Sequence, residues 1–465
     1  MGKRHENIRS TIDPRNIPSE LDQFLQHDAF SLVIKGKAGT GKTALALTIL
    51  SKSIGKQNSL YISSRLSISE LFQYYPWVQD FVDGSNKDRP TEAPESNIEI
   101  APFVDARLDE PSALFERITN ELMDTSSPLI IIDTWDAVGD FMDREALITN
   151  AKILQIWRQR SRAKLVFVLE SVEDKTFDNL VDGVIDLEEK YLESRKTRRI
   201  HLSKLRGVKI TKPWNFFTLD KGVFHSFDPY NSLEPLSLPR PIMKGIGEAP
   251  LPNGKKGSLA SNTLENLLSG SIPQHVVASL ELDPGVNPKV ALVFLAGIIA
   301  SYAKKGKVLL LPPKGIATAY IDQLLKMILR SSEQRKRVEV LKNSPITGSQ
   351  PSQLVDDLKK TIAQMKRRDP KAELIGVLSL GPSLSKGALD LDLLKTTITS
   401  DIEASVLITF SSEAVTQKIL DITDIRLRIR EIEGTLFIQP EKPWASFYGI
   451  ENDKDSGIIS VLPMV

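Results

Sequence analysis

The sequence predicts an α/β protein with two tandem lobes, each a largely parallel central sheet flanked by helices, the second lobe being degenerate. Three observations predict this fold: a phosphate-binding loop between a strand and a helix, an alternation of apolar strands with helices, and a long internal repeat. We expect a nucleotide-binding domain over 1–226, a Pro-, Gly- and Ser-rich linker over 227–256, and a second domain without a functional loop over 257–465.

The first element is a strand–loop–helix unit around the sequence GKAGTGKT. An apolar strand at 32–34 precedes the loop and an apolar-faced helix at 44–50 follows it. Backbone N–H groups of such a loop surround phosphate oxygens, the lysine reaches the outer phosphates and the last hydroxyl binds Mg²⁺. The sequence therefore predicts a nucleoside triphosphate site, with ATP and Mg²⁺ as the expected ligands. The residues of this predicted Walker A loop are Gly36, Lys37, Ala38, Gly39, Thr40, Gly41, Lys42 and Thr43.

A second buried strand supplies the carboxylate that such a site needs. Residues 129–132 are four consecutive apolar residues, as is typical of a strand covered on both faces, and Asp133 follows them directly. Ligands of α/β sheets bind at the carboxyl ends of the strands, and Mg²⁺ prefers oxygen ligands. We therefore expect Asp133 to be the Walker B carboxylate and to bind Mg²⁺ together with Thr43.

The internal repeat becomes visible when Lys42 is placed on Lys289. The strands at 60–62 and 308–310 then match within a residue, and both copies continue with a polar helix, an apolar strand and a further strand. Both copies end in antiparallel-looking strands around a Lys-Pro-Trp triplet, at Lys212–Trp214 and Lys442–Trp444. The repeat predicts the same fold twice.

The second copy lacks the features of a phosphate site. In its loop, 283–290, Pro288 removes an N–H group, and Val290 stands in place of the metal-binding hydroxyl. The position of the metal carboxylate falls near Ser379. We expect this lobe to be a docking or regulatory module.

Composition limits the function classes. The chain has 60 basic and 59 acidic residues, so its overall charge attracts neither nucleic acid nor a membrane. The absence of cysteine excludes disulfides, thiolate zinc sites and cysteine nucleophiles. The first residues lack an apolar stretch, and no apolar run is long enough to span a bilayer. We therefore expect a cytoplasmic protein with no membrane segment.

Several motifs together resemble the RecA superfamily, and the KaiC and RadA group most closely. They are the strand that ends in Asp133-Thr134, a later strand that runs into Glu170-Ser171, and Lys204-Leu205-Arg206-Gly207. The combination IKGKAGTGKT, YISSR and QYYPWV, all in the first half, resembles more narrowly the archaeal gas-vesicle regulatory protein family GvpD.

The resemblance implies roles for two bases and raises one question about hydrolysis. In ring-forming relatives the Lys and Arg of Lys-Leu-Arg-Gly reach the phosphate of the neighbouring subunit, which would make Lys204 and Arg206 trans-acting fingers. Relatives also place glutamates after the second strand to activate water, but here that position holds Ser64 and Arg65. Glu170 or Asp136 could substitute as the base, and Arg65 could contact phosphate. We expect secure binding and slow hydrolysis.

Three functions compete on these grounds. The favoured hypothesis is an ATP-binding regulatory protein with a weak ATPase activity at most, read by a protein partner or acting as a homo-oligomer. The alternative is a KaiC-like ring ATPase or autokinase. A RadA-type DNA-acting ATPase is disfavoured, because the loop 171–180, which would meet DNA, carries three acids against one base. The basic tract 195–199 is either a protein-docking patch or a solvated hairpin.

Overall fold

The computed structural model describes residues 16–53, 58–79, 103–107, 109–139, 142, 144–170, 175–230, 275–329, 331–341, 351–380, 391–410, 422–452 and 459–465. The chain divides into two compact units, Met1–Asp228 with Pro463–Val465 and Pro229–Leu462. Most of the predicted linker, 231–256, lies outside the described residues.

The first unit contains a mixed sheet that is mostly parallel. Within the described residues it has nine strands. All neighbours from β3 to β6 in the sheet pair in parallel, and β7, β8 and β9 then pair antiparallel. In spatial order the strands are β3 (Phe103–Asp105), β2 (Ser59–Ser63), β4 (Leu129–Asp133), β5 (Lys164–Leu169), β1 (Phe30–Gly36), β6 (Gly183–Leu192), β7 (Arg195–Leu205), β8 (Trp214–Thr218) and β9 (His225–Ser226).

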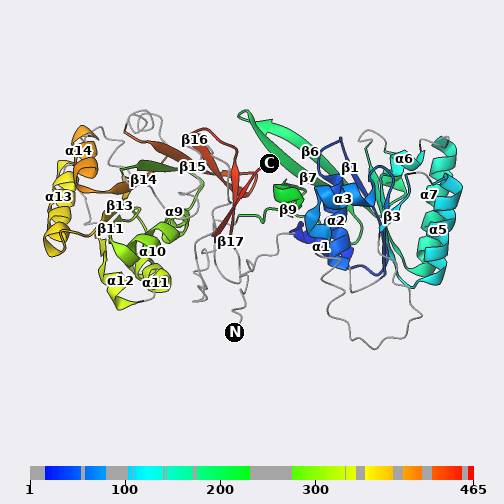
Figure 1. The fold of residues 1–465 in the computed structure, drawn as a ribbon, viewed down its shortest axis with the longest axis horizontal. Helices are drawn as coiled ribbons and strands as arrows, with labels where there is room; N and C mark the ends of the chain where they lie inside the picture. Colours follow the sequence, from blue (N-terminus) through cyan, green and yellow to red (C-terminus); the bar gives the residue numbers. More distant parts are fainter. Residues whose placement is uncertain are drawn as a thin grey trace. The chain divides into compact units, whose positions relative to one another are not determined.

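Helices cover both faces of this sheet because its central strands are apolar on both sides (Figure 1). Leu32 and Ile34 of β1 pack in one core with the first group of helices, whereas Val33 between them packs in the other core. The helices on the first face are α1 (Ser19–Leu25), α2 (Lys42–Ser53) and α3 (Ile68–Tyr74), and those on the second are α5 (Pro111–Asp124), α6 (Trp135–Gly139) and α7 (Arg144–Ser161). The short helices η1 (Phe177–Asn179) and η2 (Asp220–Gly222) lie in connections.

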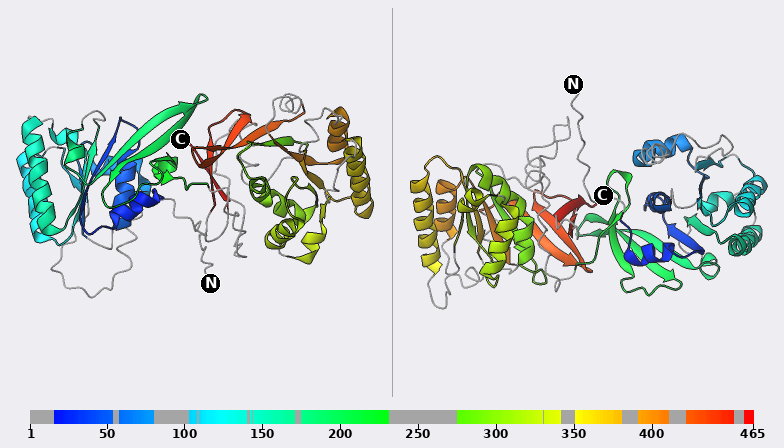
Figure 2. Two further views of the ribbon diagram at one scale, coloured as in Figure 1. Left: turned by 180° about the vertical axis from the view of Figure 1, so that it is seen from behind. Right: turned by 90° about the horizontal axis from the view of Figure 1, so that it is seen from below.

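The second unit repeats this arrangement strand for strand. The part of it that the structure describes has a nine-stranded sheet, in the spatial order β12 (Val338–Val340), β11 (Lys307–Leu311), β13 (Leu374–Ser379), β14 (Ala404–Phe410), β10 (Val277–Leu282), β15 (Ile425–Ile432), β16 (Thr435–Lys442), β17 (Tyr448–Asn452) and β18 (Ile459–Pro463). Helices again lie on both faces (Figure 2): α9 (Lys289–Phe294), α10 (Ala296–Lys305) and α11 (Thr318–Ile328) pack in one core, and α13 (Pro351–Arg368) and α14 (Leu391–Asp401) in the other. The short helix α12 (Ser332–Lys336) precedes β12.

The two sheets have the same strand order when strands are numbered within each copy. The predicted pairs of strands, such as β2 with β11 and β4 with β13, occupy the same places in their sheets. This confirms the predicted fold class of two tandem α/β lobes, an arrangement consistent with two RecA-like units.

The strand order of the first sheet brings the predicted site residues to one edge. Ser63 of β2 lies opposite Asp133 of β4, and Asp133 lies opposite Val168 of β5. The loop after β1 starts at this same edge, because β1 pairs in parallel with β5. The carboxyl ends of β1, β5, β4 and β2 therefore frame one site.

Candidate functional site

The loop after β1 has the backbone shape that a phosphate cradle requires. All seven residues of β1 are buried, which fixes the start of the loop. Gly39 and Gly41 have φ angles of +78° and +102°, a region that favours glycine because it has no Cβ. Helix α2 begins at Lys42, so the N–H groups of its first turn face the loop. The eight predicted loop residues thus form one strand-to-helix turn.

The ammonium group of Lys42 is folded over this loop. Its Nζ donates hydrogen bonds of 2.7 Å to the Gly36 carbonyl and 3.0 Å to the Lys37 carbonyl. The Thr40 hydroxyl donates to the same Lys37 carbonyl at 2.8 Å. The residue is only 6% exposed, and its burial lowers the pKa of the Lys42 ammonium. Phosphate oxygens entering the loop could replace the two carbonyls as acceptors and relieve this desolvation.

Asp133 lies where a metal ligand is expected. It ends β4, is 6% exposed, and accepts a hydrogen bond of 2.5 Å from the Tyr61 hydroxyl. The Thr43 hydroxyl also donates to it. Burial raises the pKa of Asp133 above its usual range, and these hydrogen bonds and Lys42 oppose that shift only in part. A carboxylate beside a hydroxyl is an all-oxygen donor set that suits Mg²⁺, so Thr43 and Asp133 fit that ion.

The structure places Asp136 and Glu170, the candidate bases, close to the loop. Asp136 lies in α6, just after β4, and Glu170 follows β5 directly. The Glu170 backbone N–H donates to the Asp136 carboxylate. Glu170, Asp133 and Asp136 all act electrostatically on Lys42, raising its pKa against the effect of burial. Burial raises the pKa of Asp136 itself. Carboxylates from two connections therefore surround the lysine.

The end of β2 carries no carboxylate and is fixed by hydrogen bonds. The Ser64 hydroxyl accepts from the Thr134 N–H at 2.7 Å and donates to the Thr134 carbonyl at 2.8 Å, and the Ser64 N–H donates to the Asp133 carbonyl at 2.9 Å. Arg65 extends from this point to Glu170, with 3.2 Å between Nη2 and Oε2. The position of the usual catalytic glutamates is thus occupied by a structural serine and a paired arginine.

Lys204 and Arg206 make contacts within their own unit. The Lys204 Nζ donates to the carbonyls of Asp178 at 2.9 Å and Val181 at 2.6 Å. The Arg206 Nη1 pairs with Asp182 at 2.7 Å, and its side chain is 68% exposed. Lys204 therefore supports the η1 connection, while Arg206 remains largely in solvent.

Both bases lie too far along the sheet to reach the loop of their own lobe. Lys204 is opposite Val184, and Val184 is opposite Val33 in β1. Val33 precedes Gly36 by three residues, about 10 Å along an extended strand. A role of these side chains at a phosphate thus requires the phosphate of another subunit.

Arg198 contacts the phosphate loop, although the sequence motifs did not single it out for that role. Its Nη1 donates to the Gly39 carbonyl at 2.8 Å, and its Nε donates to the Val465 carbonyl at 2.7 Å. Arg195 and Arg198 are 4% and 7% exposed, so these two members of the basic tract 195–199 are not solvated. The tract lies on β7 of the β6–β7 hairpin, and because Arg195 and Arg198 are three residues apart they lie on opposite faces of that strand.

The loop of the second lobe contains a carboxylate of its own. Asp283 follows β10 directly and pairs with Arg428 at 2.6 Å and with Arg430 at 3.3 Å. Next to it, the buried pair of Glu281 and Arg426 has an N–O distance of 2.7 Å. An anion fixed at the loop entrance repels phosphates and takes up the arginines that could bind them.

The remaining cradle of the second lobe is also occupied by protein groups. The N–H of Asn287 donates to the Tyr230 hydroxyl at 3.2 Å. The Lys289 ammonium lies 4.7 Å from the centre of the Tyr320 ring. Burial raises the pKa of that tyrosine to about 12, so it stays neutral. The arrangement supports the expectation that this loop does not bind nucleotide.

Comparison with known proteins agrees with this geometry. Residues 21–203 match the family described as "GvpD gas vesicle protein, P-loop domain". Protein GvpD1 of Halobacterium salinarum is 28% identical over 68% of this chain, and the aligned part spans 59% of the length of that relative. Protein GvpD2 of the same organism is 22% identical over 95% of both chains. The predicted resemblance is confirmed: residues 21–203 of this chain resemble the P-loop domain of GvpD proteins.

In the part of the chain that the structure describes, no helix combines the length and the apolar character that a bilayer crossing needs.

Proposed function

We propose that this GvpD-like P-loop protein is an ATP-binding regulatory protein in which nucleotide, bound with Mg²⁺ in the first lobe, controls a conformation read by a partner. The observation that carries the proposal is the contrast between the two loops. In the first, Lys42 lies beside a Thr43–Asp133 hydroxyl–carboxylate pair. In the second, Asp283 and its arginines occupy the corresponding place.

We expect slow hydrolysis because of the two residues that follow β2. Neither Ser64 nor Arg65 can accept a proton from water near neutral pH. Glu170, one of the two candidate substitutes, is engaged by Arg65. ATP then persists long enough to act as a signal, which suits a regulator better than a motor. The resemblance to GvpD proteins supports gas-vesicle control as the process that is regulated.

Bound Mg²⁺ would neutralise charge on the outer phosphates in this scheme. Thr43 and Asp133 would hold it, Lys42 would bind the outer phosphates, and the loop N–H groups would hold the remainder. The partner is a protein or a second copy of the chain. Nucleic acid is a poor candidate because basic and acidic residues nearly balance, 60 against 59.

Calorimetric titration with ATP and Mg²⁺, together with phosphate release, tests the proposal. We expect one site per chain and release far slower than in ordinary enzymes. Two sites, or no binding, would contradict the assignment of the loops.

A second candidate is a KaiC-like ATPase or autokinase. It is favoured by the proximity of Glu170 and Asp136 to Lys42, because a freed carboxylate there could orient a water. Incubation with γ-labelled ATP decides between the two, since only the second candidate releases phosphate rapidly or labels the chain.

A further inference from the structure

We propose that Arg65 senses the terminal phosphate of the nucleotide by exchanging its carboxylate partner, Glu170, for that phosphate. The inference rests on the proposed binding of ATP at the first loop. It adds a means by which this lobe distinguishes a triphosphate from a diphosphate.

The pair spans the strand that carries the metal carboxylate. Arg65 follows β2 and Glu170 follows β5, and β4 lies between these two strands. The distance of 3.2 Å between Nη2 and Oε2 therefore bridges the sheet edge above Asp133. The side chains are 47% and 33% exposed, so an incoming anion can reach both.

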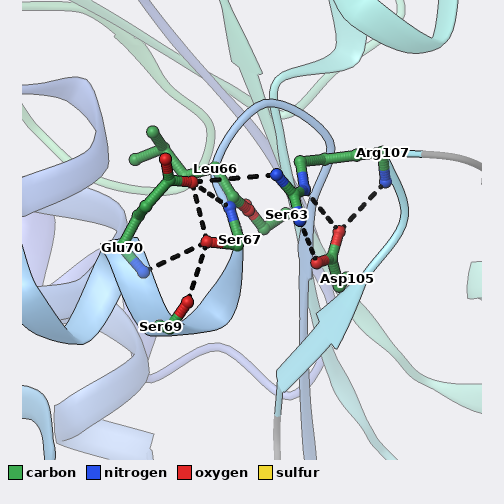
Figure 3. A network of polar contacts seen from close by, with 7 residues as sticks. All are labelled: Ser63, Leu66, Ser67, Ser69, Glu70, Asp105 and Arg107. Carbon is green, nitrogen blue, oxygen red and sulfur yellow. Dashed lines mark hydrogen bonds and ion pairs between the residues drawn. The ribbon is translucent and has the colours of Figure 1, made fainter.

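Hydrogen bonds on both sides fix the backbone that carries Arg65. Before it, Ser64 is held by the Thr134 main chain. After it, Ser67 caps α3: its hydroxyl accepts from the Glu70 N–H at 3.2 Å, and the Glu70 carboxylate accepts from the Ser67 N–H at 2.8 Å. Figure 3 shows this capping network. With its Cα fixed at both sides, Arg65 can change partners by side-chain rotation alone.

Both members of the pair follow strands whose carboxyl ends lie at the sheet edge of the phosphate loop. Arg65 and Glu170 each act on Lys42, in opposite directions. Lys42 is the group that holds the outer phosphates in a P-loop. A terminal phosphate offers several acceptor oxygens and more negative charge than one carboxylate, and guanidinium binds it in a two-pronged manner. ATP therefore competes with Glu170 for Arg65, whereas ADP leaves the pair intact.

The first experiment is a pair of titrations, with a slowly hydrolysed ATP analogue and with ADP, each with Mg²⁺. In the unmodified protein we expect a preference for the analogue of about tenfold, the scale of one charge-assisted contact. Arg65→Ala should remove that preference without weakening ADP, and Arg65→Lys should retain part of it. Glu170→Gln should increase the preference several-fold, because Arg65 then has no competing partner.

The double substitution separates partner exchange from a general charge effect. Loss of a negative charge near the phosphates tightens binding by itself. In the Arg65→Ala background, however, Glu170→Gln should no longer change the preference. Unchanged preference in Arg65→Ala, or the same effect of Glu170→Gln with and without Arg65, would overturn the inference while leaving ATP binding in place. Failure of the unmodified protein to bind either nucleotide would instead overturn the proposed function, and the inference with it.

Arg107 provides a matched control. Its side chain is 40% exposed and pairs with Asp105 at 2.9 Å and Glu70 at 3.8 Å (Figure 3). It follows β3, which lies on the far side of β2 from β4. Arg107→Ala removes a similarly exposed arginine, also paired with carboxylates, from the same sheet edge, and it should leave the analogue-to-ADP ratio unchanged. A ratio that falls as in Arg65→Ala would contradict a specific role for Arg65.

Discussion

Lys42 and Lys289 are the first residues of helices that follow equivalent strands, yet their ammonium groups have different partners. Lys42 donates to the carbonyls of Gly36 and Lys37, within its own loop. Lys289 lies over the ring of Tyr320, on another helix. The same position of the repeat therefore holds a lysine bonded to its own loop in one lobe and a lysine packed on an aromatic ring in the other.

Lys42→Ala should abolish ATP binding, because the ammonium is the charged group of the loop. Calorimetry with Mg²⁺ and ATP measures this, and thermal unfolding of the variant checks that the fold is kept. Lys289→Ala is the matched control and should leave stoichiometry and affinity unchanged. Wild-type affinity in Lys42→Ala would place the nucleotide elsewhere.

Asp133→Asn should stabilise the nucleotide-free first lobe at neutral pH by on the order of 1 kcal/mol, a usual scale for a point substitution. The pKa of Asp133 is raised by burial, so the ionised form is the disfavoured one, and the amide still accepts from Tyr61. The same variant should weaken binding of Mg²⁺-ATP. Thermal unfolding and calorimetry measure the two effects.

The sign of this effect predicts its pH dependence. A group with a raised native pKa contributes stability that is present below its unfolded value, here 3.8, and is lost as the pH rises through the native value. The advantage of Asp133→Asn should therefore be largest above the native pKa of Asp133 and shrink as the pH falls toward 3.8. An advantage that grows on acidification would contradict a raised pKa.

Phosphate release should be slower than about 1 s⁻¹, the lower end of ordinary enzyme turnover. Any residual rate should depend on a carboxylate next to Lys42. Glu170→Gln should lower it about tenfold or more if Glu170 orients the water, and Asp136→Asn should lower it similarly if Asp136 does. A single-turnover assay with labelled ATP separates these cases. Turnover of tens per second would refute slow hydrolysis.

Arg206 should link nucleotide to assembly. Its side chain is 68% exposed and pairs only at its tip with Asp182, so a neighbouring phosphate can attract it. Sedimentation should show larger species with a slowly hydrolysed ATP analogue than without nucleotide, and Arg206→Ala should remove the difference. This variant is cleaner than Lys204→Ala, since Lys204 also supports the η1 connection. A monomer in both states would exclude the trans role.

The sequence predicted the structure well where one short segment contains the whole motif. The loop from Gly36 to Thr43 has fixed spacing, and Asp133 follows an uninterrupted apolar strand. The repeat was visible because buried parallel strands need runs of apolar residues in both copies. Matching runs then predicted matching places in the two sheets, as the strand orders confirm.

Contacts between residues far apart in the sequence were harder to predict from the sequence. Arg198 reaches Gly39 across 159 positions, and Tyr61 reaches Asp133 across 72. No pattern in the sequence predicts either contact, because each contact depends on strand register and on the direction of the side chains. The basic tract illustrates the limit: its charge is plain in the sequence, but the burial of Arg195 and Arg198 follows from their places on β7.

The pairing of Asp283 with Arg428 and Arg430 has a thermodynamic consequence. The Asp283 carboxylate is covalently part of the chain, so its effective concentration next to the two arginines is constant. It does not depend on the concentration of any solute. A ligand stabilises only the unit that binds it, by an amount that rises with the logarithm of ligand concentration. In a calorimetric scan, ATP should therefore raise the melting temperature of the first lobe and leave that of the second lobe unchanged. The second lobe then provides an internal reference.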